Sequence, residues 1–233
     1  MKGLWTISLS SKLLAIFVMI FVSSCQIANE DIKLYPFESE EGYWGYMNSK
    51  GKVVIKPEYA WAEEFSEGLA LVSNSHGPHQ QSGFIDKDGK EVIPYIYWDA
   101  GSFSDGAARV SLATNSSDHR WTYIDNQGNQ LFNKEFELVR DFCEGYAAVV
   151  KEGTIRPIPL EWSISPPKWS YIDKSGEFVT DLMFDEAYDF CYGFAVVKNS
   201  DKYGVIDSSF CLVVDYQFNT LSECNEYIKM ELL

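Results

Sequence analysis

The sequence predicts an all-β fold, built as an array of about five antiparallel repeats of three short strands each. Three observations carry this prediction. An aromatic segment followed by a polar turn recurs along the chain, a second block with a phenylalanine and a glycine follows each copy, and apolar runs separate the turns. One such repeat cannot bury its own aromatic side chains, so we expect stacked copies to share a continuous core.

The first block consists of a short aromatic strand and a turn that begins with Asp or Asn. The turn residue accepts hydrogen bonds from backbone N–H groups farther along, and a glycine takes the position with positive φ. We expect the apolar strand after the turn to end at Pro57 in the first copy and at Pro94 in the second, because proline removes a ladder donor. The five copies begin at Trp44, Ser82, Trp121, Trp169 and Tyr203.

The second block has the pattern Phe-x-acid-Gly and predicts another turn, followed by the third strand. It begins at Phe65, Phe103, Phe142 and Phe190, and the last of these carries Tyr192 in place of the acid. The fifth copy is degenerate, with Phe210 where the turn glycine stands elsewhere, as suits a terminal cap. We expect an open, solenoid-like array, with a propeller-like ring as the alternative, because closure depends on a small rotation per repeat.

Residues 43–230 resemble the bacterial WG-repeat family. The family pattern runs approximately Trp-Gly-aromatic-Ile-Asp-x-x-Gly and continues with Phe-x-acid-Gly-x-Ala. The literal Trp-Gly pair stands only at Trp44 and Gly45, whereas the other copies keep either the tryptophan or the glycine. The resemblance implies an architecture of β-repeats and supplies no catalytic residues.

The N-terminus predicts export. Lys2 and Lys12 precede an apolar run that is too short for a membrane span, so residues 1–24 have the character of a signal peptide. The segment Val22–Cys25 resembles the lipobox of bacterial lipoproteins, which implies lipidation of Cys25; an ordinary signal peptide is the alternative. Residues 25–42 then form an anchor and linker, and residues 43–233 form the repeat domain. Gln26 after the cysteine resembles the sorting signal for the outer membrane.

Composition excludes two classes of protein. The 233 residues carry a formal net charge of −15, and no basic cluster stands out, which argues against nucleic-acid binding. Aromatic residues make up 15% of the chain, enough to argue against disorder.

Metal and disulfide sites were considered at three places. The Asp column of the turns resembles the start of a calcium loop, but Tyr97 stands where the distal carboxylate would be, so we assign the column to turn stabilisation and predict no metal. His76, His79 and His119 fall in loops between repeats and are interpreted as solvated. Cys143 and Cys191 hold equivalent positions in repeats three and four, so a disulfide between them is considered.

The residues considered for binding are aromatic or proline-rich. An apolar insert at 152–168 separates repeats three and four and contains Pro157, Pro159 and Trp162. It forms either a binding loop or a cover over one edge of the core. Trp61 and Trp98 are the other candidates for exposed anchors.

These features predict a non-enzymatic protein without cofactors, held in the bacterial cell envelope by its N-terminal lipid. We expect a surface for protein–protein interaction, because the chain combines an anchor with modular repeats and shows no catalytic constellation. A module that binds glycan or peptidoglycan is the alternative, suggested by the aromatic candidates.

Overall fold

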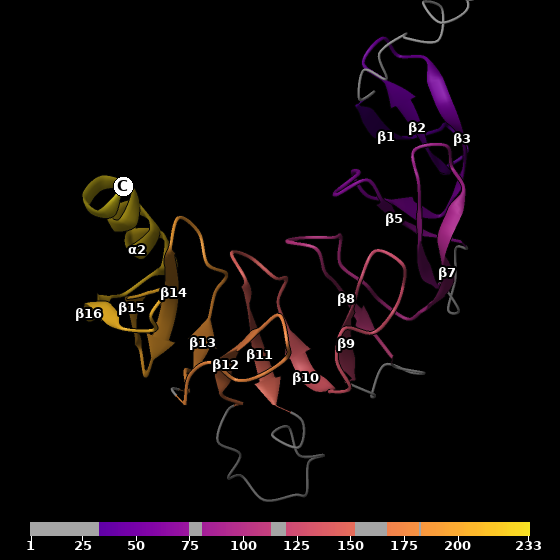
Figure 1. Ribbon diagram of the computed structural model, residues 1–233. Helices are drawn as coiled ribbons and strands as arrows, with labels where there is room; N and C mark the ends of the chain where they lie inside the picture. The colour runs from indigo at the N-terminus through magenta and orange to yellow at the C-terminus, as the bar shows by residue number, and fades with distance from the viewer. Residues whose placement is uncertain (1–32, 75–80, 113–119, 152–166, 182) are drawn as a thin grey trace, which may run out of the picture. The chain divides into compact units, whose positions relative to one another are not determined.

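Antiparallel strands make up almost all of the regular structure of the described residues, and their helical segment lies at the C-terminus (Figure 1). The computed structural model describes residues 33–74, 81–112, 120–151, 167–181 and 183–233. Residues Leu34–Leu233 form one compact unit. The all-β prediction is therefore confirmed.

The strands form four hydrogen-bonded sheets, all of them antiparallel. The first contains β1 (Leu34–Glu38), β2 (Trp44–Asn48) and β3 (Val53–Tyr59). The second contains β4 (Trp61–Ala62), β5 (Ala70–Ser73), β6 (Ser82–Ile85) and β7 (Glu91–Tyr97). The third contains β8 (Ala108–Ser111), β9 (Trp121–Ile124), β10 (Phe136–Val139), β11 (Tyr146–Lys151) and β12 (Trp169–Asp173). The fourth contains β13 (Glu186–Ala187), β14 (Phe194–Asn199), β15 (Lys202–Asp207) and β16 (Leu212–Phe218).

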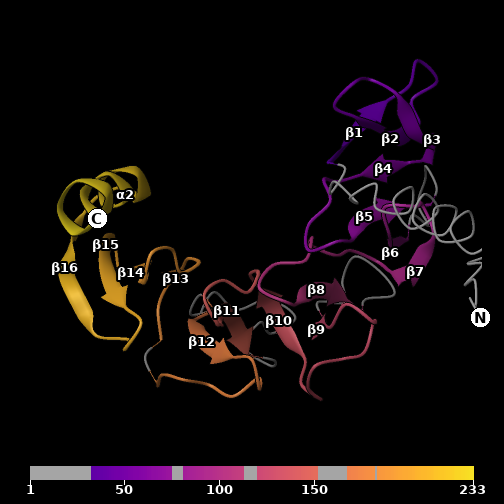
Figure 2. The same ribbon diagram turned by 45° about the horizontal axis from the view of Figure 1, so that its top comes forward.

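The third strand of one sequence repeat shares a sheet with the first strand of the next. β5, the third strand of repeat one, pairs over its whole length with β6, the first strand of repeat two. β11 pairs with β12 and β14 pairs with β15 in the same way. Unfolding one repeat would therefore also remove a pairing partner from the next repeat. Among the described strands no pairing joins the first sheet to the last. Figure 2 shows the strands of the four sheets from a second side.

The glycine of the Trp-Gly position lets the second strand of a repeat approach closely. A Cβ at Gly83 would lie 2.7 Å from the carbonyl oxygen of Ile93, and one at Gly45 would lie 2.6 Å from that of Ile55. Contacts this short with backbone atoms do not occur, so a side chain here would displace the strand. Repeats one, two and five keep this glycine, and their second strands β3, β7 and β16 each span seven residues.

Repeats three and four lack the glycine, and their described residues form no regular second strand there. Thr122 and Ser170 stand at the position, and each hydroxyl donates to a carbonyl oxygen across the gap, of Lys134 and Thr180 respectively, at 3.1 Å. Only isolated bridges remain, such as Ile124 to Gln130. The strand predicted after the turn in every repeat is thus irregular in these two.

Pro57 and Pro94 lie inside β3 and β7 and do not end them. Each of these strands is the last of its sheet and is irregularly paired with its single neighbour, so the missing N–H costs no ladder bond. The prediction that the prolines end the strands is wrong for this reason.

The Asp turns follow the predicted chemistry. The Asp86 Oδ1 atom accepts from the N–H groups of Asp88 at 3.0 Å and Lys90 at 2.9 Å, and Gly89 takes a φ of 80°. These bonds hold the pKa of the equivalent carboxyl groups of Asp125 and Asp173 below the usual value, with hydrogen bonds from Asn129 and Ser175 as the largest causes. Asn48, Asp125, Asp173 and Asp207 make the same pair of contacts.

Phe210 occupies the glycine position of the fifth turn with a φ of 60°. Its ring packs against those of Tyr146 at 5.0 Å and Phe190 at 5.6 Å between centroids. A residue of this size fits because repeat four has Thr180 where the preceding repeats have Ile55, Ile93 and Phe132, whose side chains lie against the turn glycines. Aromatic packing thus offsets the strained backbone.

Buried tyrosines tie the first strand of a repeat to a backbone carbonyl group 17 residues farther along the chain. The hydroxyl of Tyr171 donates to the carbonyl oxygen of Tyr188 at 2.6 Å, and Tyr46 and Tyr123 make equivalent bonds. All three side chains are fully buried. Burial raises the pKa of Tyr171.

Replacing Tyr171 with phenylalanine is expected to lower the free energy of unfolding by about 1–2 kcal/mol, because the buried carbonyl of Tyr188 loses its donor. Chemical denaturation measures the change. Tyr227→Phe is the control, since its hydroxyl makes no hydrogen bond with the described residues, and it should leave stability within about 0.5 kcal/mol. Equal losses in the two variants would show that the hydrogen bond contributes nothing.

The C-terminus departs from the repeat. Residues expected to form the last turn and third strand instead form α2 (Leu221–Tyr227) and a π-helical segment, η1 (Ile228–Leu232). Thr220 caps α2 by accepting from the N–H of Glu223. Cys224 and Ile228 then cover Val196, Val205 and Val214 of the last sheet. No helix among the described residues is long and apolar enough to span a membrane.

Candidate functional site

The Phe-x-acid-Gly blocks form two-residue turns in which both central residues have positive φ. In the first, Glu67 has a φ of 52° and Gly68 a φ of 90°, and Ser66 pairs with Leu69 on either side. This is the geometry of a type I′ hairpin turn. It leaves the carboxylate and the glycine N–H pointing outward from the turn. The blocks at Phe103, Phe142 and Phe190 form the same turn.

The acid of each turn binds the glycine of the next turn. The Glu67 carboxylate accepts from the N–H of Gly106 at 2.9 Å, and Asp105 accepts from that of Gly145 at 2.6 Å. Glu144 accepts from Tyr192 at 2.7 Å and from Gly193 at 2.8 Å. We call this series the acid–glycine ladder. It joins consecutive repeats through charge-assisted bonds.

The ladder ends at the fourth turn, where Tyr192 replaces the acid. Tyr192 therefore has no carboxylate that could accept a hydrogen bond from a following turn. The fifth copy has a helix where that turn would lie. The side chain of Tyr192 is 70% exposed. The end of the ladder and the end of the regular repeats coincide.

A second column of contacts runs beside the ladder. The hydroxyl of Ser66 donates to the carbonyl oxygen of Phe103 at 2.6 Å, and that of Ser104 donates to the carbonyl oxygen of Phe142 at 2.7 Å. Each turn thus holds the backbone of the next phenylalanine. Cys143 and Cys191 occupy the same position in turns three and four.

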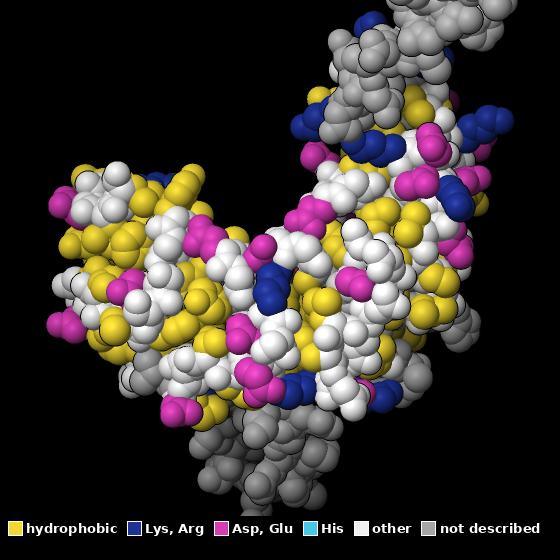
Figure 3. Space-filling model, in the orientation of Figure 1, with side chains coloured by type: hydrophobic (Ala, Val, Ile, Leu, Met, Phe, Trp, Pro, Cys, Tyr) yellow, Lys and Arg dark blue, Asp and Glu magenta, His cyan; other side chains and the backbone are white. Residues whose placement is uncertain are grey.

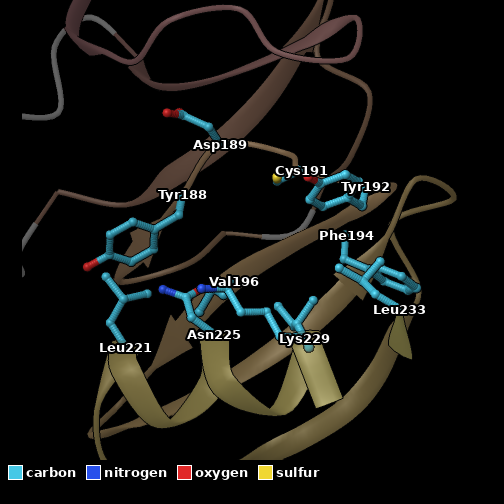
Figure 4. Close-up of a pocket in the computed structure, with 11 residues that line it drawn as sticks. Tyr188, Asp189, Cys191, Tyr192, Phe194, Val196, Leu221, Asn225, Lys229 and Leu233 are labelled. Carbon is cyan, nitrogen blue, oxygen red and sulfur yellow. The ribbon is translucent and has the colours of Figure 1, made fainter. Parts of the chain in front are cut away.

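A groove of about 280 Å³ opens between the fourth turn and the C-terminal helices. Figure 4 shows that the turn and β14 form one wall and that residues of α2 and η1 form the other. The lining is mainly apolar and aromatic. It consists of Tyr188, Asp189, Cys191, Tyr192, Phe194, Val196, Leu221, Asn225, Ile228, Lys229 and Leu233. We call it the terminal groove.

The C-terminal helical segment also carries exposed apolar residues. Leu233 is 62% exposed and Met230 is 78% exposed. Figure 3 shows hydrophobic side chains gathered over the C-terminal sheet and helix on the face drawn. Large apolar side chains at a concave end of a repeat series are typical of a binding surface.

The carboxyl group of Asp189 lies at the rim of the groove and points away from the helix residues (Figure 4). Burial raises its pKa, and Arg140 partly opposes the rise. The guanidinium carbon of Arg140 lies 4.5 Å from the ring centre of Tyr188 and 5.4 Å from that of Trp169. These stacked contacts hold the inner wall in place.

Other charged contacts link repeats along the same side of the array. Arg109 Nε lies 2.6 Å from Asp141 Oδ1. Lys174 Nζ lies 3.3 Å from Asp105 Oδ2, although Lys174 belongs to the repeat two places after that of Asp105. The same Nζ atom lies 4.2 Å from the ring centre of Phe142. These polar groups are partnered, so they add rigidity to the array and leave the terminal groove as the open site.

The residues singled out in the sequence for binding do not gather at this groove. Trp61 is 47% exposed, with its ring centre 5.0 Å from that of Trp44, and Trp98 is 39% exposed. Both belong to the first part of the array. Pro157, Pro159 and Trp162 lie outside the described residues, as do Cys25 and the three histidines, so their roles stay predictions.

The repeat pattern does not predict the groove, because the groove lies where the sequence departs from that pattern. Tyr192 breaks the acid position, and Cys224 to Tyr227 break the next turn. From the sequence, the departure of the fifth copy indicates a terminal cap, and Tyr192 indicates only the loss of the acid.

The described cysteines are free thiols. Cys143 is half-buried and burial raises its pKa, whereas Cys191 is exposed in the groove. The disulfide between them stays a prediction. The described residues contain no group of three or more His, Cys, Asp or Glu side chains placed to hold a metal ion.

The fold and the ladder define a β-repeat protein. The family model of the WG containing repeat matches residues 44–75, 83–112, 121–154 and 169–203, more than half of the chain. The chain therefore belongs to the WG-repeat family. The match omits the fifth copy beyond residue 203, where the helix replaces the last turn.

Comparison with curated proteins gives no match. Among solved structures, one described as "KlHsv2 with loop 6CD replaced by a Gly-Ser linker" is similar with 13% identity and a TM-score of 0.46. The alignment covers 77% of this chain and 62% of that chain. A second, described as "Crystal structure of the eukaryotic initiation factor", has 9% identity and a TM-score of 0.31, with 81% and 74% of the chains covered.

Proposed function

We propose that this protein is a non-catalytic interaction protein of the bacterial cell envelope, anchored by lipid on Cys25, and that it binds another protein at the terminal groove. The observation that carries the proposal is the apolar opening at the fourth turn. There the acid–glycine ladder stops and Tyr192 and Leu233 stay exposed.

The chemistry of the groove supports a protein partner. Aromatic residues are enriched in the centres of protein interfaces, and charged residues are depleted there. Tyr188, Tyr192 and Phe194 supply aromatic surface in the groove. Its 280 Å³ lies just below the range of about 300–1,000 Å³ that is usual for drug-sized ligands, and it suits a few side chains of a partner.

The anchoring part of the proposal rests on the sequence. The segment Val22–Cys25 resembles a lipobox, and it places the lipid at the N-terminal end of the mature chain. Acylation with several chains gives stable attachment to a membrane. We place the protein in the outer membrane on the basis of Gln26.

One observation favours the alternative function, binding of glycan or peptidoglycan. Trp44 and Trp61 form a tilted pair, and Trp61 is 47% exposed. An exposed aromatic face can stack on the apolar face of a sugar ring. Trp61→Ala should abolish retention on peptidoglycan if this reading is right.

Photo-cross-linking in living cells tests the proposal. A benzophenone amino acid replaces Asn225, which lines the groove, or Glu226, the next residue on the same helix, which does not. We expect a discrete protein adduct from position 225 and none from position 226. Equal labelling from the two positions, or no protein adduct from either, would contradict a protein site in the groove.

A further inference from the structure

The first strand of a repeat has one position that packs into the core of the repeat before it. Repeats two to five have an almost completely buried isoleucine there: Ile85, Ile124, Ile172 and Ile206. Ile124 of repeat three, for example, belongs to the apolar cluster that contains Phe84 and Phe103 of repeat two. Met47 holds this position in repeat one, and it is only half-buried. None of the apolar clusters of the described residues includes Met47.

The residue opposite this position differs in the first sheet as well. In the later repeats the isoleucine pairs across the strands with a buried alanine: Ala70, Ala108, Ala147 and Ala195. In the first sheet, Met47 of β2 pairs with Tyr35 of β1, which is exposed. An alanine leaves room for a closely packed preceding repeat, whereas a tyrosine fills that room. The first sheet therefore suits a different neighbour on this side.

These residues belong to an apolar surface that we call the N-terminal face: Tyr35, Phe37, Met47 and Val53. Cross-strand partners lie on the same face of a sheet, and Met47 pairs with Tyr35 on one side and with Val53 on the other. Phe37 follows Tyr35 by two residues in β1 and so shares the face. Val53 is exposed, and Phe37 is half-buried.

The charges around the N-terminal face are arranged by sign. Lys50 and Lys52 are exposed in the turn between β2 and β3. Glu40 and Glu41 are exposed in the turn between β1 and β2, at the other end of these strands. The first residue of β1 pairs with Asn48, just before the lysine turn. The basic end of the face is therefore also the end at which the chain enters the sheet.

The proposed lipid anchor lies close to this end along the chain. Cys25 precedes Leu34, the first residue of β1, by nine residues. Such a segment spans at most about 30 Å when it is fully extended. Acyl chains on Cys25 would keep the start of β1 within that distance of the membrane, so the first repeat is the one that the anchor brings to the lipid.

We infer that the N-terminal face docks on the surface of the membrane that holds the lipid of Cys25. Tyr35 and its apolar neighbours enter the headgroup region, which aromatic side chains with a polar end prefer. Lys50 and Lys52 lie against anionic phospholipid headgroups. The inference rests on the anchoring part of the proposed function and adds a second contact with the same membrane.

A membrane is a better occupant of this face than a second copy of the chain. The chain has a net charge of −15, so two copies repel each other, whereas the basic edge of the face attracts an anionic surface. The membrane is also already within reach of the tether, which raises its effective concentration at the face.

Fluorescence quenching by lipid tests the inference. A dansyl amino acid replaces Val53 or Leu212 in the lipoprotein, which is purified from cells into nanodiscs of phosphatidylcholine and phosphatidylglycerol. Leu212 holds the equivalent position in repeat five and is 40% exposed, against 44% for Val53. Bromine near the carbonyl end of the acyl chains quenches only a fluorophore in contact with lipid. We expect brominated lipid to cause a loss of emission at position 53 and none at position 212.

Charge variants test the role of the lysine turn. Lys50→Glu combined with Lys52→Glu should lower the quenching at position 53 at least about twofold, because the attraction to phosphatidylglycerol becomes repulsion. The turn should persist, since Asn48 holds it through the backbone N–H groups of both residues. Lys202→Glu combined with Lys229→Glu changes the net charge equally in the last repeat and should leave the quenching unchanged. Equal quenching in the two double variants would overturn the inference.

The remaining outcomes separate other occupants and the proposed function. A blue shift at position 53 without quenching would show that protein covers the face, either a second copy or residues 26–32, and would overturn the inference. Mass spectrometry of the same sample reports acylation of Cys25. If Cys25 is acylated but position 53 is not quenched, the inference alone is wrong. If Cys25 carries no acyl chain, the anchoring part of the proposed function is wrong, and the inference is wrong with it.

Discussion

Replacing Gly83 with valine is expected to lower the free energy of unfolding by about 3 kcal/mol, the largest effect expected of any single substitution considered. Even the Cβ atom would lie 2.7 Å from the carbonyl oxygen of Ile93 and 2.9 Å from the amide nitrogen of Tyr95. Both are backbone atoms and cannot move aside as a flexible side chain would. β7 should therefore detach, which chemical denaturation and amide hydrogen exchange of Glu91–Tyr97 would both detect.

Thr122→Val is the matched control, because it stands at the same position of repeat three, where the second strand already lies farther away. Its cost should be about 1 kcal/mol, from the lost hydrogen bond to Lys134. If both variants lost the same stability, close approach at the glycine would not explain why β7 forms and repeat three has no such strand.

Glu144→Ala should lower the free energy of unfolding by about 2 kcal/mol and reduce the cooperativity of unfolding. The substitution removes the acceptor for the N–H groups of Tyr192 and Gly193, at 2.7 and 2.8 Å. Hydrogen bonds to a charged group contribute about 1.5–3 kcal/mol each, and the exposure of Glu144 reduces that value here. Because stability in a repeat array depends on each interface, the last repeat should unfold first.

Tyr192→Ala is the control for the ladder. Tyr192 occupies the same turn position with almost the same φ, 54° against 53°, but it accepts no hydrogen bond from a following turn. Its change in unfolding free energy should stay within about 0.5 kcal/mol. A loss as large as that of Glu144→Ala would assign the effect to turn conformation and would rule out the ladder as its cause.

The features that the sequence predicts well are local. The hydrogen bonds of Asp86 and its counterparts span two and four residues, so residue type and spacing are enough to predict them. The positive φ of the turn glycines follows from the same pattern. The repeat register and the all-β class follow from the recurrence of the two blocks.

The features that the sequence does not predict depend on contacts between repeats. The sequence predicts Glu67 as an ordinary surface acid, because its hydrogen-bond donor, the N–H of Gly106, lies 39 residues away in the chain. Pro57 predicts the end of a strand because the sequence does not show that this strand lies at the edge of its sheet. The loss of the second strand in repeats three and four follows from Thr122 and Ser170, but only once the close approach at the glycine is known.

The site shows the same division. Exposed tryptophans can be proposed from residue type, whereas the terminal groove lies between two parts of the chain that depart from the repeat. These are Tyr192 in the turn and the helix from Leu221.

The most direct test of the central claim, that the end of the array binds a partner protein, is amide hydrogen exchange of the full-length protein in its native membranes. It is compared with the purified protein in nanodiscs. The account predicts that exchange slows in the native membranes at Tyr188–Phe194 and Leu221–Leu233, and stays the same at Val53–Tyr59. Equal exchange in the two preparations at the first two segments would contradict occupation of the terminal groove.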